Sequence, residues 1–167
     1  GMKNFIWFIW FLTLVAVLTL PTAHADTMTG RVVGITDGDT LTLLDATNTQ
    51  HKIRLAGIDA PEKNQPFGQA CKQSLSDLAY NRTVQIDWNK LDRYGRVIGK
   101  VLVYGQDVNL EQIRRGCAWH YKKYQNEQNP EDRASYARAE EGARASRVGV
   151  WVEGGAIPPW EWRHRPK

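Results

Sequence analysis

The sequence has little cysteine, with only Cys71 and Cys117 in a chain of 167 residues. Two cysteines are too few for a disulfide-rich scaffold, and the chain contains no Cys-x-x-Cys motif. The pair could form one disulfide if the protein is exported, or it could remain as two buried free thiols. The sequence alone leaves both alternatives open.

Internal repeats and low-complexity segments are also missing, and the one long apolar run lies at Phe5 to Leu20. This run is shorter than the roughly 20 residues that a helix needs to cross a bilayer, which argues against an uncleaved anchor. Lys3 precedes the run, and Ala23-His24-Ala25 places small residues at the positions that a signal peptidase reads. We therefore expect residues 1–25 to form a signal peptide, with Gly1 as an expression scar. The protein would then be exported, to a periplasm or out of the cell, with no membrane association after cleavage.

A strong excess of one charge is absent too. The formal net charge is +4, and it falls to +3 without residues 1–25, which contain Lys3 and no acidic residue. This balance indicates a polyanionic partner only weakly. The length of the remaining chain suits one domain with a sizeable core. We expect that domain over residues 26–152 and a tail over residues 153–167 that packs on it or trails from it.

The hydrophobic pattern predicts short strands followed or interrupted by helices. Five β-prone segments are expected as strands, at residues 28–36, 40–44, 51–58, 84–88 and 97–104. Three segments with helical periodicity are expected as helices, at residues 66–80, 108–115 and 129–147. This order predicts an α+β fold in which a five-stranded OB-type β-barrel carries three helices.

Three polar segments lie where strands are expected to end or turn, namely Asp37 to Thr40, Arg54 to Glu62 and Asp92 to Arg96. Each has a purely structural interpretation. Asp37-Gly38 is a common hairpin turn, Arg54 and Glu62 could form a surface ion pair, and Asp92 to Arg96 could be a solvated hairpin tip. Together, however, they supply what phosphodiester hydrolysis needs. Carboxylates can bind a divalent cation, arginines can clamp the phosphate, and a further carboxylate can act on the attacking water.

In this order the three segments resemble the staphylococcal nuclease (thermonuclease) family. The resemblance extends over roughly residues 30–152 and includes Val108-Asn109, Arg114-Arg115-Gly116 and Gly149-Val150-Trp151. It implies a monomeric, Ca²⁺-dependent nuclease that hydrolyses DNA and RNA by in-line attack of water and leaves 3′-phosphate ends. Weak sequence specificity and a preference for single-stranded or frayed substrate are expected.

The resemblance implies a cation site built from two side chains and one backbone group. Asp39 and Asp59 would bind Ca²⁺ through their carboxylates, and Ala60 would add its carbonyl oxygen. Asp37 and Thr40 would lie beside these ligands and support them. Carboxylate ligands by themselves would also admit Mg²⁺ or Mn²⁺.

Three further side chains would carry the chemistry. Glu62 would orient or deprotonate the attacking water, and Arg54 and Arg96 would hold the phosphate and stabilise the transition state. A non-catalytic binding module on the same fold is the alternative, and it would be expected to have lost some of these residues or Asp39. A domain that binds oligosaccharide or protein would lack the combined set altogether. None of the four residues is substituted, so we favour catalysis.

Substrate contacts are implied for six residues: Asp92, Arg93, Tyr94, Tyr121, Lys122 and Tyr124. Lys122 falls where the family has a base-stacking tyrosine, and Tyr121 precedes it by one residue. His120 could be taken for a catalytic base, but we favour a structural or surface role. Trp160 and Trp162 could form a nucleic-acid platform, although we expect them to cover the core.

Overall fold

The computed structural model describes Gly1 and residues 26–167. The predicted signal peptide, residues 1–25, therefore lies outside the described residues except for Gly1. Within the described part of the chain, no helix is both long enough and apolar enough to span a membrane.

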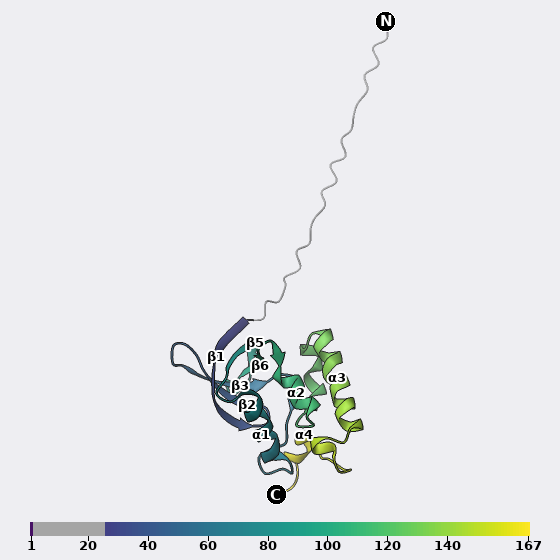
Figure 1. Cartoon of the computed structure of the whole chain (residues 1–167). Helices are drawn as coiled ribbons and strands as arrows, with labels where there is room; N and C mark the ends of the chain where they lie inside the picture. The colour runs from purple at the N-terminus through teal and green to yellow at the C-terminus, as the bar shows by residue number, and fades with distance from the viewer. Residues whose placement is uncertain (2–25) are drawn as a thin grey trace.

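A closed five-stranded barrel forms one half of the molecule, on the left in Figure 1. Its strands are β1 (Asp26–Asp37), β2 (Thr40–Leu44), β3 (Gln50–Leu55), β5 (Thr83–Leu91) and β6 (Val97–Val103). Neighbouring strands pair antiparallel in the order β3-β2-β1-β5-β6, and a parallel pairing between β3 and β6 closes the barrel. The predicted α+β fold with an OB-type barrel is confirmed.

Alternation along the strands fills the barrel. In β6 every second residue is buried, from Val97 through Gly99 and Val101 to Val103, because successive side chains of a strand point to opposite faces. The interior is made by branched apolar side chains of all five strands: Val32, Leu41, Leu43, Ile53, Leu55, Val84, Ile86, Val97 and Val101. This core fixes the register, and therefore determines which polar residues emerge at the barrel's edge.

The three predicted helices are confirmed as α1 (Gly68–Ala79), α2 (Val108–Arg114) and α3 (Pro130–Ala145). The side chain of Asn129 caps α3 by accepting a hydrogen bond from the backbone of Asp132 at 2.8 Å. Short elements not predicted from the sequence complete the chain. They are β7 (Gln106–Asp107), two 3₁₀ turns over Lys122–Glu127 and Gly149–Trp151, and α4 (Pro159–Trp162).

The third predicted strand, residues 51–58, was wrong at its end. β3 stops at Leu55, and β4 (Ile58–Asp59) leaves the barrel to pair with β8 (Trp119–His120) in a separate sheet. Gly57 between them has a φ of 76°, in the left-handed region that breaks an extended strand. The break redirects Asp59 out of the barrel wall and toward the turn between β1 and β2.

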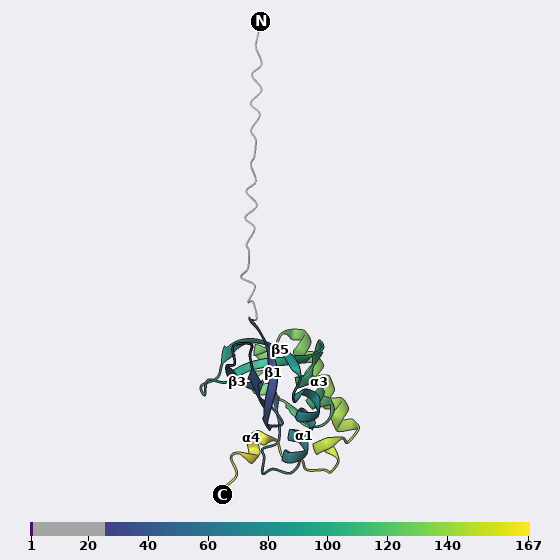
Figure 2. The same cartoon turned by 60° about the vertical axis from the view of Figure 1, so that its left-hand side comes forward.

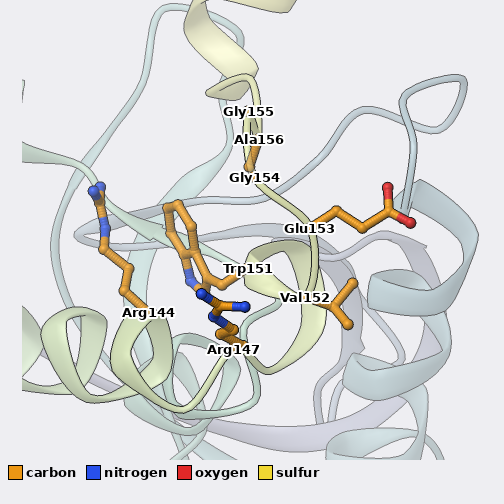
Figure 3. A pocket seen from close by; sticks show the side chains of 8 residues that line it. All are labelled: Arg144, Arg147, Trp151, Val152, Glu153, Gly154, Gly155 and Ala156. Carbon is orange, nitrogen blue, oxygen red and sulfur yellow. The ribbon is translucent and has the colours of Figure 1, made fainter.

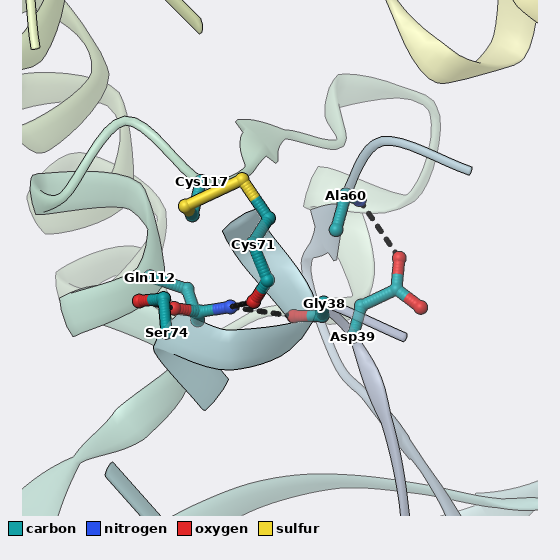
Figure 4. The surroundings of a disulfide bond; sticks show 7 residues. All are labelled: Gly38, Asp39, Ala60, Cys71, Ser74, Gln112 and Cys117. Carbon is teal, nitrogen blue, oxygen red and sulfur yellow. Dashed lines mark hydrogen bonds between the residues drawn. A yellow bond between two sulfur atoms is a disulfide. The ribbon is translucent and has the colours of Figure 1, made fainter. Parts of the chain in front are cut away.

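A disulfide between Cys71 and Cys117 ties α1 to the segment that follows α2, so the sequence's open question is answered in favour of a bond. Gln112 of α2 lies just beneath this link, as Figure 4 shows. Its amide nitrogen donates to the carbonyl oxygens of Gly38 at 2.8 Å and Cys71 at 3.1 Å. The disulfide, α1 and α2 thus form a rigid support under the β1–β2 turn.

The C-terminal segment, residues 153–167, folds back against the domain. Gln65 donates a hydrogen bond to the carbonyl oxygen of Ile157 at 2.7 Å. Trp160 packs on a buried cluster made of Cys71, Cys117, Trp119 and Val150, in agreement with the expected covering role. In Figure 2, α4 lies beside the end of the molecule that carries α1. This position brings the residue after α4, Arg163, to the site described next.

Candidate active site

The turn between β1 and β2 carries the first predicted ligand. The chain does reverse here, one residue later than the structural interpretation expected: Asp37 pairs with Thr40, and Gly38 and Asp39 form the turn between them. The turn projects Asp39 toward β4. A Cβ on Gly38 would lie 2.8 Å from the Cβ of Ala60 and 3.2 Å from that of Cys71, so only glycine allows this close approach. The turn therefore serves both chain reversal and the site.

Asp39 bridges the turn to the segment after β4. Its Oδ2 accepts a hydrogen bond from the backbone N–H of Ala60 at 2.8 Å, drawn as a dashed line in Figure 4. Its Oδ1 accepts from the Thr40 hydroxyl at 3.1 Å, and Asp37 Oδ1 accepts from the Asp39 backbone N–H at 3.1 Å. Asp39 and Thr40 are buried. Asp37 and Thr40 thus hold Asp39 in place through these two hydrogen bonds.

Arg54 gathers the two predicted carboxylate ligands. Its terminal nitrogen Nη2 lies 3.3 Å from Asp39 Oδ2 and 3.3 Å from Asp59 Oδ1. The other terminal nitrogen donates to the carbonyl oxygens of Leu55 and Ile58, at 2.8 and 2.9 Å, which fixes the guanidinium plane. Arg54 therefore pairs with two buried carboxylates, and the alternative of a surface ion pair with Glu62 does not hold in this structure.

Glu62 and Asp59 share a partner that the sequence did not indicate. Arg163 donates through Nη1 to Asp59 Oδ1 at 3.1 Å and to Glu62 Oε1 at 2.8 Å. Its Nη2 donates to Asp59 Oδ2 at 2.8 Å. The contacts place Glu62 beside the two buried carboxylates, with about a third of its own side chain exposed.

The loop between β5 and β6 presents Arg96. Asp92 organises this loop by accepting hydrogen bonds from the backbone N–H groups of Tyr94 and Arg96, both at 2.9 Å, and from Arg96 Nε at 2.7 Å. Ile98, two residues after Arg96, pairs with Arg54 across the β3–β6 ladder. Arg96 therefore lies just before β6, two residues ahead of the residue that pairs with Arg54.

Crowding of acids is the dominant electrostatic feature of this site. Burial and the neighbouring Asp39 carboxylate raise the pKa of Asp37 to about 7. Burial also raises the pKa of Asp59; the hydrogen bond from Arg163 lowers it, and Asp39 raises it again. The Asp39, Asp59 and Glu62 carboxylates pair with the guanidinium groups of Arg54 and Arg163, and the Asp37 carboxylate lies beside Asp39.

The residues present fit a hard divalent cation. Asp39 and Asp59 are buried carboxylates that repel each other, and a cation would relieve that repulsion. Among residues 26–167, no group of three or more Asp, Glu, His or Cys side chains is arranged so that it could hold a metal ion. The ligand set of Asp39, Asp59 and the Ala60 carbonyl stays a prediction.

Five of the six residues expected to contact substrate form two groups. Arg93 and Tyr94 lie on the β5–β6 loop, where the Arg93 guanidinium stacks 4.8 Å from the Tyr94 ring, and Asp92 is engaged within that loop. Tyr121 stacks on Trp160 with ring centroids 5.5 Å apart and meets Tyr124 edge-on at 5.1 Å.

Lys122 points elsewhere. It pairs with Glu140 of α3 at 2.9 Å.

His120 is fully buried: its Nε2 shares a hydrogen bond with Gln128 at 2.8 Å, and its backbone N–H donates to Glu140 at 2.7 Å. This geometry agrees with the favoured structural role of His120.

Three residues to which the sequence assigned no role support the site: Asn109, which lies in the motif Val108-Asn109, Gln112 and Arg163. Asn109 and Gln112 are fully buried polar residues on α2. Asn109 donates to the carbonyl oxygens of Ala56 and Gly99, each at 3.0 Å, at the point where β3 breaks. Polar residues on the apolar face of the predicted helix were the available signal for these two. No comparable pattern marked Arg163.

A surface pocket of about 400 Å³ lies away from these residues, at the end of α3. Figure 3 shows its lining, in which the Arg144 and Trp151 side chains stand beside a glycine-containing loop. Arg144 is already engaged, because its guanidinium lies 4.2 Å from the Trp151 ring and pairs with Glu140 at 3.2 Å. None of the predicted site residues lines this pocket.

Comparison with known proteins places the chain among nucleases. Residues 52–153 match the family described as "Staphylococcal nuclease homologue". An "Uncharacterized endonuclease" of Haemophilus influenzae is 44% identical, over 83% of this chain and 75% of the relative. A "Micrococcal nuclease" of Shigella flexneri is 39% identical, over 92% of this chain and 90% of the relative. "Protein ParB" of Escherichia coli is 36% identical, over 89% and 86%. The chain belongs to the staphylococcal nuclease family.

Proposed function

We propose that the protein is an exported, Ca²⁺-dependent nuclease that hydrolyses DNA and RNA and leaves 3′-phosphate ends. One observation carries the proposal: Arg54 holds Asp39 and Asp59 together, and Glu62 stands next to Asp59. The family's nuclease-named relatives support a hydrolytic phosphodiesterase. The cation, the cellular location and the product ends are inferences from the site chemistry and the N-terminal sequence.

The side chains divide the work of hydrolysis. Arg54, and Arg96 just before the strand that pairs with β3, would bind two phosphate oxygens, retaining their charge at any working pH. Glu62 would hold the attacking water and accept its proton as the bond to the 5′ oxygen breaks. Asp39, Asp59 and the Ala60 carbonyl would hold the cation. Bound there, a Ca²⁺ ion would neutralise charge that develops on the phosphate.

Substrate would extend from this point over the aromatic side chains. Tyr94 is exposed on the β5–β6 loop and Tyr124 is partly exposed beside Tyr121, so both can stack on unpaired bases. Such stacking tolerates any base, which supports weak sequence specificity. Lys122 is held by Glu140, so we propose that Tyr121 and Tyr124, rather than Lys122, contact the bases.

Two features support export. The N-terminal sequence has the layout of a signal peptide, and disulfides such as Cys71–Cys117 persist mainly in oxidising compartments. A protein that requires Ca²⁺ would also be poorly active where free Ca²⁺ is scarce. We further propose that the protein acts as a monomer.

The decisive experiment measures cleavage of single-stranded DNA and RNA with Ca²⁺ and with a chelator. We expect cleavage in Ca²⁺ and none in chelator. Treatment of the products with a 3′-phosphatase should change their electrophoretic mobility. The cleavage rate should fall by about 10²-fold or more in Glu62→Ala and Arg96→Ala. Arg138→Ala is the matched control, since Arg138 lies exposed on α3. Binding without cleavage by the unmodified protein would reject the proposal and favour the non-catalytic alternative.

A further inference from the structure

Arg163 reaches the site from the opposite end of the chain. It follows α4, and its two terminal nitrogens span both oxygens of Asp59, at 3.1 and 2.8 Å. One of these nitrogens also bonds Glu62 at 2.8 Å. A single guanidinium therefore contacts both a proposed cation ligand and the proposed acceptor of the water's proton.

The surrounding segment holds Arg163 in this position. Ile157 is bound by Gln65 at 2.7 Å, and Trp162 Nε1 donates to Asn64 at 3.3 Å. Trp160 stacks on Tyr121 and meets Trp119 edge-on at a centroid distance of 6.4 Å. These contacts fix α4 while about a third of the Arg163 side chain remains exposed. The guanidinium can therefore leave Asp59 by rotating toward solvent without undocking α4.

A guanidinium and a divalent cation cannot both bind the Asp59 carboxylate oxygens at the same time. Ca²⁺ binds carboxylate oxygens at 2.3–2.6 Å, and Arg163 already lies against both Asp59 oxygens. Like charges this close repel strongly where the surroundings are buried, and Asp59 is 1% exposed. A cation that binds Asp59 must therefore displace Arg163, or else it binds with much lower affinity.

We infer that Arg163 competes with the divalent cation for the Asp59 carboxylate and thereby sets the cation affinity of the site. Because α4 is docked, the competitor is tethered and acts at a high effective concentration. Cation binding releases Arg163 from Glu62 as well, which frees Glu62 Oε1 to accept a hydrogen bond from the attacking water. Arg163 is a positioning residue on this account. The inference rests on the proposed cation site.

Calorimetric titration of the purified full protein with Ca²⁺, without nucleic acid, tests the competition. We expect Arg163→Gln to bind Ca²⁺ about tenfold more tightly than the unmodified protein, or about 1.4 kcal/mol. Arg163→Lys should fall between them, because an ammonium cannot span both carboxylate oxygens as a guanidinium does. Arg165→Gln is the matched control from the same segment, since Arg165 stacks on Trp162 at 4.7 Å. Its affinity should equal that of the unmodified protein.

The remaining outcomes separate the inference from the proposed function. Equal Ca²⁺ affinities for Arg163→Gln and the unmodified protein overturn the competition and leave the cation site standing. A lower cleavage rate in Arg163→Gln with unchanged Ca²⁺ affinity likewise overturns it, and assigns Arg163 to the substrate instead. Failure of every variant to bind Ca²⁺ overturns both the inference and the proposed site. Circular dichroism of each variant establishes that the fold is retained.

Discussion

Arg163 and Asp59 are 104 residues apart in the sequence and form a two-pronged ion pair, with N–O distances of 3.1 and 2.8 Å. Arg54 is the other arginine in contact with Asp59, at 3.3 Å. The pair joins the residue that follows α4 to the centre of the site. Its removal should therefore have consequences for stability that depend on whether a divalent cation is present.

The first prediction concerns that stability. Without divalent cations, Arg163→Gln should lower the free energy of unfolding by about 1 kcal/mol, because Asp59 loses one of its two arginine partners while Arg163 itself is partly exposed. Saturating Ca²⁺ should close the gap, since Arg163 no longer holds Asp59. Urea denaturation in chelator and in Ca²⁺ measures the free energy of unfolding of the variant and of the unmodified protein under the two conditions. A deficit of equal size under the two conditions would contradict this expectation.

The second prediction separates function from folding at Asp39. Asp39→Asn should lower cleavage by about 10²-fold or more, yet change the cation-free free energy of unfolding by only about 1 kcal/mol or less. The asparagine oxygen can still accept the hydrogen bond from Ala60, and repulsion from Asp37 and Asp59 is relieved. Activity assays and urea denaturation provide the two readouts. Asp77→Asn, on the exposed face of α1, is the control and should alter neither.

The sequence predicted the barrel because alternating apolar residues are a local pattern that places the strands. The roles of Asp39, Arg54 and Asp59 followed from the family resemblance and stay predictions, although the structure does bring the three side chains together. The predicted third strand, residues 51–58, extends too far because sequence alternation does not show that Gly57 takes a positive φ, which breaks the strand. The difference changes the path of the backbone but not which residue reaches the site, since β4 still brings Asp59 there.

Long-range contacts were beyond sequence reasoning. Arg163 reaches Asp59 because Trp160 docks α4 on Trp119 and Tyr121. The hydrophobic periodicity of the sequence does not predict such docking. Gln112 bonds carbonyl groups of Gly38 and Cys71 that become neighbours only in the folded chain. Residues of this kind are specified by tertiary packing, so a local pattern can show that a polar side chain is buried but not what it will contact.

The third prediction concerns the disulfide. Thiol titration of the unfolded, unreduced protein should find no free thiols, because Cys71 and Cys117 are bonded to each other. Replacing both by serine should lower the free energy of unfolding by about 2–4 kcal/mol, since the bond closes a loop across 46 residues. Denaturation of the unmodified protein with and without reductant gives an independent measure. Detection of two free thiols would rule out the bond.

The last prediction is a loss of stability in mild acid that originates at His120. Burial is the largest influence and lowers the pKa of His120; the hydrogen bond with Gln128 raises it, the Lys122 charge lowers it, and smaller effects of Glu140 and Arg133 raise and lower it. A histidine with a lowered folded pKa stabilises the protein fully above its unfolded value of about 6.5.

As the pH falls below about 6.5, the unfolded state takes up a proton that folded His120 does not, so stability declines by up to about 1.4 kcal/mol per pH unit until the folded pKa is reached. His120→Gln should remove this contribution while retaining a side chain that can bond Gln128. Urea denaturation between pH 7.5 and roughly 5 compares the two proteins, and the difference between their curves isolates His120 from the carboxylates that also titrate there. His51→Gln is the matched control, because His51 pairs with Asp45 in the β2–β3 turn, away from the buried core. Parallel curves for His120→Gln and the unmodified protein would show that the imidazole titrates alike in both states.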